Sequence, residues 1–153
     1  MRLYLDCCCY NRPFDAIFQN DALEESNSII SIIIRASSGN DQILGSTILD
    51  SEINKIKDLE KKFKVQALYK FASIYIPYTL EIQAFAKKIC EKSKIHFKDS
   101  LHLASAKFGN ADIFLTTDYR LIRSCKNIEF NFKIMNPINY FAEVLKNGEN
   151  QFK

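Results

Sequence analysis

The sequence predicts an α/β protein of three layers, in which helices cover both faces of a central, mostly parallel sheet. Short apolar segments alternate with longer amphipathic ones, as expected when each strand is followed by a helix. Residues 113–116 form an almost continuous apolar run, which is typical of a strand covered on both faces. A chain of 153 residues suits one domain, which we place at residues 1–147, followed by a polar tail at 148–153.

The first elements follow from local patterns. Residues 2–5 are short and partly apolar and predict a buried first strand. Pro13 predicts a turn or loop at residues 11–15, because proline lacks an N–H donor and biases the residue before it away from helix. The next segment, residues 21–37, predicts a helix with one broad apolar side. That side consists of Leu23, Ile29, Ile30, Ile33 and Ile34.

Asp21 can cap this helix, and Gly39 with the two polar residues after it ends it. Residues 42–45 then form a short second strand. A further helix begins at Ser46 or Thr47, since Thr47 and Asp50 have the spacing of a capping box. The lysine-rich segment after it, residues 55–70, also predicts a helix. The apolar residues expected to point inward from that helix are Leu59, Phe63 and Leu68.

The C-terminal half contains three more predicted helices and a strand. Pro77 interrupts the helical pattern, and a helix follows at residues 79–90. Residues 99–108 predict a helix with a face of small residues. Residues 130–134 are a strand candidate. Residues 137–145 predict a closing helix that has proline in its first turn.

Composition and charge exclude several classes of protein. Apolar residues make up 47% and charged residues 25%, which is ordinary for a soluble globular domain. The longest apolar stretch, near residues 29–34, is far shorter than the about 20 residues that cross a bilayer. Asp6 and Arg12 interrupt any N-terminal signal peptide, and glycine motifs for nucleotide phosphates are missing. A formal net charge of +3 permits nucleic-acid binding without requiring it.

The five cysteines indicate a reducing compartment. Their number is odd, three are adjacent, and none has the spacing of a zinc site. We therefore expect free thiols packed as small apolar side chains in a cytoplasmic protein with no membrane association.

Four carboxylates are placed to meet at one edge of the sheet. Asp6 follows the first strand, Glu52 lies in the helix after the second, Asp99 opens a helix, and Asp118 ends the run that begins at Ile113. Ligands of open parallel sheets bind outside the carboxyl ends of the strands. Each acid taken alone has an ordinary explanation as a cap or turn residue, but their joint placement predicts a shared site.

Other acids fit that site less well. Asp112 precedes the strand that Asp118 follows, so the two lie about 20 Å apart. Asp50 is the expected capping partner, and residues two apart on a helix do not share a face, which leaves Glu52 free. Asp15 lies beyond Pro13 in the predicted loop and ranks below the four.

A cluster of carboxylates needs compensation. At about 6 Å and an effective dielectric constant near 20, each pair of like charges costs about 3 kcal/mol. The cluster must therefore stay partly protonated or hold a cation, and oxygen ligands favour Mg²⁺ or Mn²⁺. Such a site suits hydrolysis of phosphodiester bonds.

Four blocks of sequence resemble the PIN-domain proteins of the VapC-like ribonuclease family. They are LYLDCCCYNRPFD at residues 3–15, STILDSEI at 46–53, DSLHLASA at 99–106 and ADIFLTTD at 111–118. The resemblance implies an α/β/α PIN fold and a Mg²⁺- or Mn²⁺-dependent ribonuclease. The catalytic and metal-binding positions that it implies are Asp6, Glu52, Asp99 and Asp118. Members of the family often act as the toxin of a toxin–antitoxin pair, so RNA, an antitoxin protein and a second copy of the chain are the implied partners.

Several polar residues are candidates for binding the substrate. Asn11 and Arg12 follow Asp6, and the guanidinium of Arg12 suits a phosphate. The resemblance implies that Thr116 or Thr117 adds a hydroxyl beside the metal or the phosphate. The basic run at residues 55–64 is ordinarily a solvated helix face and alternatively follows a nucleic-acid backbone.

His102 lies one turn after Asp99 and has two interpretations. It either packs near the core with its ring hydrogen-bonded, which is the more common role, or touches substrate. Two functional alternatives also stay open. One is a catalytically silent PIN-fold module that binds RNA or protein. The other is a different aspartate-based α/β enzyme, which is disfavoured because Asp6 is followed by cysteines and not by a second acid.

Overall fold

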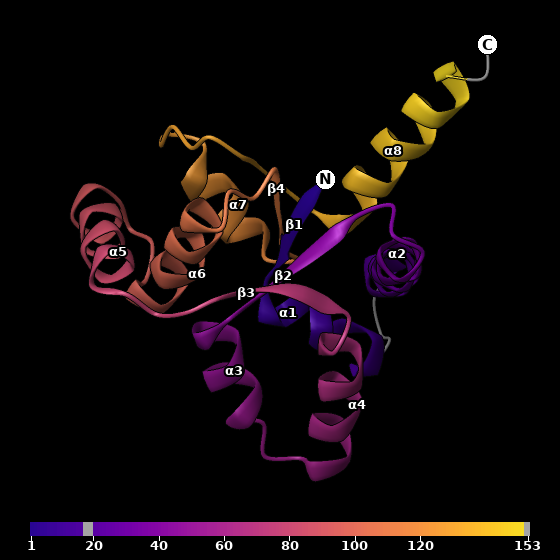
Figure 1. The fold of residues 1–153 in the computed structure, drawn as a ribbon, viewed down its shortest axis with the longest axis horizontal. Coiled ribbons are helices and arrows are strands. Elements are labelled where there is room, and N and C mark those ends of the chain that lie inside the picture. The colour runs from indigo at the N-terminus through magenta and orange to yellow at the C-terminus, as the bar shows by residue number, and fades with distance from the viewer. Residues whose placement is uncertain (17–19, 152–153) are drawn as a thin grey trace.

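The computed structural model describes residues 1–16 and 20–151, with the backbone alone for residues 20 and 145–151. Five strands form one sheet, every neighbouring pair is parallel, and their order is β3-β2-β1-β4-β5 (Figure 1). The strands are β1 (Arg2–Leu5), β2 (Gln42–Ser46), β3 (Ala72–Ile76), β4 (Ile113–Leu115) and β5 (Lys133–Met135). The helices are α1 (Cys7–Asn11), the short 3-10 helix η1 (Arg12–Phe14), α2 (Asn20–Ser37), α3 (Thr47–Asn54), α4 (Leu59–Tyr69), α5 (Leu80–Lys92), α6 (Phe97–Phe108), α7 (Tyr119–Cys125) and α8 (Pro137–Gln151).

The middle of the sheet is apolar on both faces. Leu3, Tyr4 and Leu5 of β1 are fully buried, as are Phe114 and Leu115 of the adjacent β4. Successive side chains of a strand point to opposite faces of the sheet, so consecutive residues are all buried only when both faces are covered. The predicted three-layer architecture with a parallel sheet is therefore confirmed.

Figure 1 shows the outer layers, with α5 and α6 on one side of the sheet and α2 and α8 on the other. The inward face of α5 carries Ile82, Ala86 and Ile89, all buried. The small-residue face predicted for α6 is also buried, at Ala104 and Ala106. Small residues let a helix approach its neighbours closely, which brings the N-terminal turn of α6 next to the carboxyl ends of the strands.

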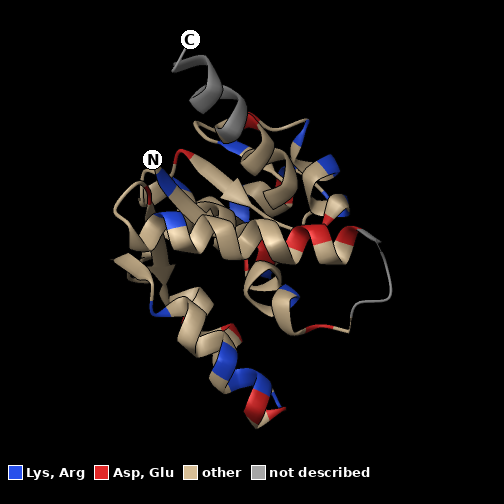
Figure 2. Ribbon diagram, turned by 90° about the vertical axis from the view of Figure 1, so that its right-hand side faces the viewer, with Lys and Arg blue, Asp and Glu red and all other residues tan. Residues whose placement is uncertain are grey.

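Helix α2 buries a narrower stripe than its sequence predicts. Ile29 and Ile33 are buried, as expected, and so is Ile32. The prediction is wrong for three residues of the proposed apolar side, which are exposed: Leu23, Ile30 and Ile34. The helix lies at the surface of the outer layer (Figure 2), so only the side that faces η1, α8 and the sheet is covered.

Helices α3 and α4 project beyond the carboxyl edge of the sheet (Figure 1). The prediction that Leu59 and Phe63 point inward is wrong, because their exposed fractions are 78% and 74%, and the buried residue of α4 is Val65. Asp58 caps α4 by accepting the N–H groups of Glu60 and Lys61, so the helix begins at Leu59. An outlying helix with few neighbours buries one narrow stripe. Here that stripe excludes Leu59 and Phe63, whereas the third predicted residue, Leu68, is partly buried against the core.

The capping box expected at the start of α3 is not formed. Ser46 is the cap, and its Oγ accepts the N–H of Leu49 at 3.1 Å. Asp50 instead accepts the hydroxyl of Tyr75 at 2.7 Å, which ties α3 to β3. Asp50 is therefore engaged with Tyr75 and leaves Glu52 free. The sequence also predicted a free Glu52, but on the assumption that Asp50 caps the helix.

Some elements differ from the predictions. Residues 11–14 complete α1 and form η1, within the segment expected to be a turn or loop, and α1, β3 and α7 were not predicted. The last strand is Lys133–Met135, not 130–134, because Phe130 and Phe132 stack together at 5.0 Å before the strand begins. Helix α8 continues past residue 145 to Gln151, and so includes residues 148–151 of the expected tail.

Two smaller expectations concern the thiols and the membrane. All five cysteines are free, as predicted. Within the described part of the chain, no helix combines the length and the apolar character that a bilayer crossing needs.

Candidate active site at the carboxyl edge of the sheet

The strand order reverses between β1 and β4, whose carboxyl ends lie side by side. Leu5 pairs with Leu115, and the N–H of Asp6 donates to the carbonyl of Leu115 at 2.9 Å. In open parallel sheets the crevice at such a reversal is where ligands bind. Asp6 and the segment 116–118 therefore stand where this fold most readily builds a site.

Asp6 is held in a single orientation. Its Oδ1 accepts the N–H of Cys7 at 2.8 Å, which caps α1. Its Oδ2 accepts the hydroxyl of Thr116 at 3.1 Å and the thiol of Cys8 at 3.6 Å. The residue is 7% exposed, so the carboxylate faces the crevice from a largely buried position.

Glu52 reaches the same edge from α3. Its Oε1 accepts the N–H of His102 Nε2 at 2.8 Å and pairs with the ammonium of Lys98 at 3.4 Å. Burial alone would raise the pKa of Glu52, but His102 and then Lys98 outweigh it and lower the pKa to about 2. His102 Nε2 also lies 3.9 Å from Asp6 Oδ1, so its ring stands between these two carboxylates.

Asp99 and Asp118 line one cleft of about 90 Å³ between α6 and α7. Burial raises the pKa of Asp99, the charge of Asp6 raises it further, and His102 offsets part of the rise. Asp118 and Glu52 add smaller contributions in the same direction. The charges of the other three predicted acids therefore all act on Asp99. Asp118 also caps α7, because its Oδ1 accepts the N–H of Arg120 at 3.0 Å.

The four carboxylates offer the oxygen donors that a hard divalent cation prefers. Burial is the largest cause of the raised pKa of Asp99, and the negative charges of Asp6, Asp118 and Glu52 add to it. Over residues 1–16 and 20–151, however, no three His, Cys, Asp or Glu side chains are spaced as metal ligands in this arrangement. The chemistry of the site fits Mg²⁺ or Mn²⁺, and Asp6, Glu52, Asp99 and Asp118 are the residues that would hold the ion.

The acids ranked below these four lie elsewhere. Asp112 accepts the N–H of Arg2 at 2.7 Å, at the opposite edge of the sheet. Asp15 pairs with Lys61 at 2.8 Å and Arg12 at 3.6 Å.

Arg12 forms ion pairs within the fold, with Glu25 and Asp15, and does not point its charge to the crevice alone. Its Nε lies 3.2 Å from Oε1 of Glu25, a carboxylate that is 3% exposed, and its Nη1 contacts Asp15. A buried acid without its cation would be costly, so Arg12 is largely committed to Glu25. Its predicted contact with a phosphate stays a prediction that this arrangement does not favour.

The other predicted substrate contacts are mostly engaged as well. The Oγ1 of Thr116 donates to Asp6 and accepts the N–H of Asp118 at 3.1 Å, so it supports the acids on both sides. Thr117 is buried, and the side-chain amide of Asn11 donates to the sulfur of Cys7 at 3.7 Å. Binding of substrate by these residues stays a prediction.

The structure adds basic residues that were not predicted from the sequence. Lys94, His96 and Arg120 line the cleft that contains Asp99 and Asp118. None of the three forms an ion pair within 4.0 Å among the described residues. The one available signal was that Lys94 and His96 precede Asp99 closely and Arg120 follows Asp118 closely in the sequence.

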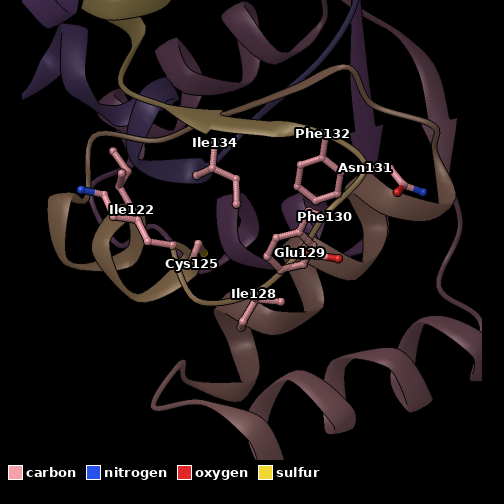
Figure 3. Close-up of a pocket in the computed structure, with 9 residues that line it drawn as sticks. Ile122, Cys125, Ile128, Glu129, Phe130, Asn131, Phe132 and Ile134 are labelled. Atoms are coloured by element: carbon pink, nitrogen blue, oxygen red, sulfur yellow. The ribbon is translucent and has the colours of Figure 1, made fainter.

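A separate pocket of about 420 Å³ lies beside the edge strand β5 (Figure 3). Its lining comes from α7, the following segment and β5, and mixes apolar side chains such as Ile122 and Phe130 with polar ones such as Glu129. None of the four candidate carboxylates lines it. We regard it as a packing gap beside the edge strand and not as part of the candidate site.

Comparisons with known proteins support the fold. No family model matches the sequence, and no curated protein does. One solved structure that matches is described as the crystal structure of VapBC2 from Rickettsia felis bound to a DNA fragment from their promoter. The match has a TM-score of 0.60 and 17% identity and covers 89% of this chain and 98% of that chain. The chain has a PIN-like fold. At this identity the likeness establishes the fold alone, and the function is argued from the site.

Proposed function

We propose that this protein is a Mg²⁺- or Mn²⁺-dependent ribonuclease that hydrolyses RNA phosphodiester bonds at Asp6, Glu52, Asp99 and Asp118. The observation that carries the proposal is that Asp6, Glu52 and Asp118 lie close enough to Asp99 for their charges to raise its pKa. They come from different elements, and Asp6 follows a strand at the reversal point of the sheet. Repulsion between carboxylates costs free energy, and a bound cation would offset that cost. We therefore expect the site to hold a cation.

The surroundings of each carboxylate suggest a different role in the proposed reaction. Mg²⁺ or Mn²⁺ held by the carboxylates would activate a water and stabilise the leaving oxygen. Asp6 is already fixed by Cys7 and Thr116, so little side-chain freedom is lost when it binds an ion. Asp99 and Asp118 line the open cleft, where a phosphate can reach them.

The proposal is tested with the full-length protein and a fluorescent RNA substrate. We expect cleavage with Mn²⁺ or Mg²⁺ and none in chelator, together with Mn²⁺ binding by calorimetry. A folded sample that neither binds Mn²⁺ nor cleaves RNA would contradict the proposal.

We further propose that the RNA strand crosses the cleft beside Asp99 and Asp118. Lys94, His96 and Arg120 lie on this path without ion partners among the described residues, whereas Arg12 is already paired. The lysines of α4 suit this role less well: Lys61 pairs with Asp15, and Lys64 pairs with Glu60 at 3.3 Å. Figure 2 shows that basic and acidic residues are mixed near the start of α4.

The variant Lys94→Ala/Arg120→Ala should weaken RNA binding about tenfold, measured by fluorescence anisotropy in chelator, where cleavage cannot interfere. If each residue contacts one phosphate, the slope of log affinity against log salt should fall by about 0.7 for each lost contact. The control Lys87→Ala/Lys133→Ala removes the same charge away from the cleft and should change affinity much less. Equal losses in both variants would show that net charge, and not this path, governs binding.

An antitoxin-type protein is the partner that we propose for this chain. The matched structure is a VapBC2 complex, described as bound to DNA from its promoter. On this chain, exposed apolar side chains occur on α2 and on α4, and they are the first candidates for a surface that a partner would cover. They are Leu23, Ile30, Ile34, Leu59 and Phe63. A homodimer is the other candidate, and light scattering of the purified chain distinguishes a dimer from a monomer that awaits its partner.

One observation favours a second candidate function. Glu52 is already paired with His102 and Lys98, so one of the four acids needs no metal to compensate its charge. A catalytically silent PIN-fold module that binds RNA or protein would keep such a site. It predicts RNA binding in the anisotropy assay without Mn²⁺ uptake in the calorimeter.

A further inference from the structure

A buried chain of hydrogen bonds leads from the core to Glu52. Ser46 Oγ and the Tyr4 hydroxyl are 2.8 Å apart, and the Tyr4 hydroxyl lies 2.7 Å from His102 Nδ1. His102 Nε2 then lies 2.8 Å from Glu52 Oε1. Ser46, Tyr4 and His102 are fully buried, and the four residues come from β2, β1, α6 and α3.

The hydrogens in this chain can be assigned by what each group is able to donate. The carboxylate of Glu52 only accepts, so His102 Nε2 must carry a hydrogen in either protonation state of the ring. Burial raises the pKa of the Tyr4 hydroxyl, which keeps it protonated. Ser46 Oγ accepts the N–H of Leu49, so its own hydrogen is free for Tyr4, and the hydrogen of Tyr4 can go to Nδ1 in the tautomer that carries its hydrogen on Nε2.

We propose that His102 is a positioning residue that orients Glu52 toward the metal site, and that Tyr4 fixes the ring tautomer that does so. This inference rests on the proposed function. Both His102 and Lys98 contact Oε1 of Glu52, so Oε2 is turned away from these two partners. Because Nε2 also lies 3.9 Å from Asp6 Oδ1, the ring keeps two acids of different elements beside each other.

Packing alone does not explain these polar atoms. The ring of Tyr4 stacks on Phe114 at 5.3 Å and 7°, a contact that a phenylalanine would make equally well. A buried hydroxyl and a buried imidazole are costly unless every donor and acceptor is satisfied. An apolar pair would be the simpler core, so we assign the polar pair to the orientation of Glu52.

Two variants of His102 separate the effect of its hydrogen-bond donor from the effect of its side-chain volume. His102→Gln can place an N–H close to the position of Nε2, whereas His102→Leu fills the space without a donor. Loss of a residue that orients a metal ligand typically costs about 10–100-fold in metal affinity or activity. We expect His102→Leu to lose about 100-fold in kcat and Mn²⁺ affinity, with KM for RNA unchanged, and His102→Gln to recover about tenfold of it.

Tyr4→Phe should lower kcat about tenfold with KM unchanged. Tyr140→Phe is the matched control, because it removes another buried hydroxyl, which donates to Asp41 at 3.1 Å, outside the set of residues assigned to the site. The control should lower thermal stability without changing kcat or Mn²⁺ affinity. In the metal-free wild type, nitrogen NMR shifts should show hydrogen on Nε2 of His102.

The outcomes separate this inference from the proposed function. If the wild type cleaves RNA but Gln and Leu at position 102 have equal effects, or Nε2 carries no hydrogen, the positioning role is overturned and the nuclease stands. If Tyr4→Phe and Tyr140→Phe change kcat equally, the role of Tyr4 is overturned. If the wild type neither binds Mn²⁺ nor cleaves RNA, both proposals fail.

Discussion

Replacing Asp6 and Asp99 together by asparagine should abolish metal-dependent RNA cleavage while the protein stays folded. Each change keeps the size of the side chain and removes one negative charge from the proposed ion site. Metal ions contribute several kcal/mol of transition-state stabilisation, and about 1.4 kcal/mol corresponds to a factor of ten in rate. We therefore expect the rate to fall at least about 100-fold, with loss of Mn²⁺ binding in the calorimeter.

Asp112→Asn is the matched control for this experiment. Asp112 is also an aspartate next to a central strand, but it binds the N–H of Arg2 at the opposite edge of the sheet. It should leave cleavage and Mn²⁺ binding unchanged. Metal-dependent cleavage that survives in the double variant at Asp6 and Asp99, with a wild-type circular dichroism spectrum, would refute the assignment of the site.

The positions of Asp6 and Asp118 could be predicted because they depend on local signals. Asp6 directly follows β1 and Asp118 comes three residues after the end of β4, and the alternation of strands and helices makes those strands parallel. Parallel strands present their carboxyl ends at one edge, so both acids had to lie there. The burial and hydrogen bonding of His102 followed from its place on a helix that faces the core.

The partners of these residues could not be predicted, because they are set by tertiary contacts. Arg12 meets Glu25 only when η1 packs against α2. Tyr4 and His102 are far apart in the sequence and meet because α6 crosses the sheet next to β1. Neither contact leaves a periodic signal in the chain.

Strand β3 and the inward face of α4 escaped prediction for related reasons. β3 lies at the edge of the sheet and is partly exposed, so its apolar residues are interrupted by polar and aromatic ones and resemble the end of the preceding helix. Phe63 was expected inside because large apolar residues usually are, but α4 projects from the domain. The core can be read from hydrophobicity only where a helix has neighbours on its apolar side.

In the metal-free protein, Asp99→Asn and Glu52→Gln should change stability in opposite directions. The pKa of Asp99 is raised in the fold, so its ionised form opposes folding once the pH exceeds the ordinary value of 3.8. The pKa of Glu52 falls from 4.5 to about 2, so its ionised form favours folding. At pH 7 in chelator, Asp99→Asn should raise the melting temperature and Glu52→Gln should lower it.

The size of the Glu52 effect can be bounded. The fall in pKa corresponds to at most about 3 kcal/mol, and solvent screening of this partly exposed group reduces it to about 1–2 kcal/mol. Gln keeps an oxygen that accepts from His102, so the variant removes the charge and retains the hydrogen bond. Urea denaturation at pH 7 measures the difference.

The pH dependence gives a second check on the same pair. Stability from Glu52 is complete above pH 4.5 and is lost as the pH falls toward about 2, so Glu52→Gln should converge with the wild type in acid. The gain in Asp99→Asn should appear only as the pH rises above 3.8, because below it the carboxyl of Asp99 is protonated in both states. Two variants that shift stability with the same sign at pH 7 would show that these acids do not share the electrostatic surroundings from which we infer a cation site.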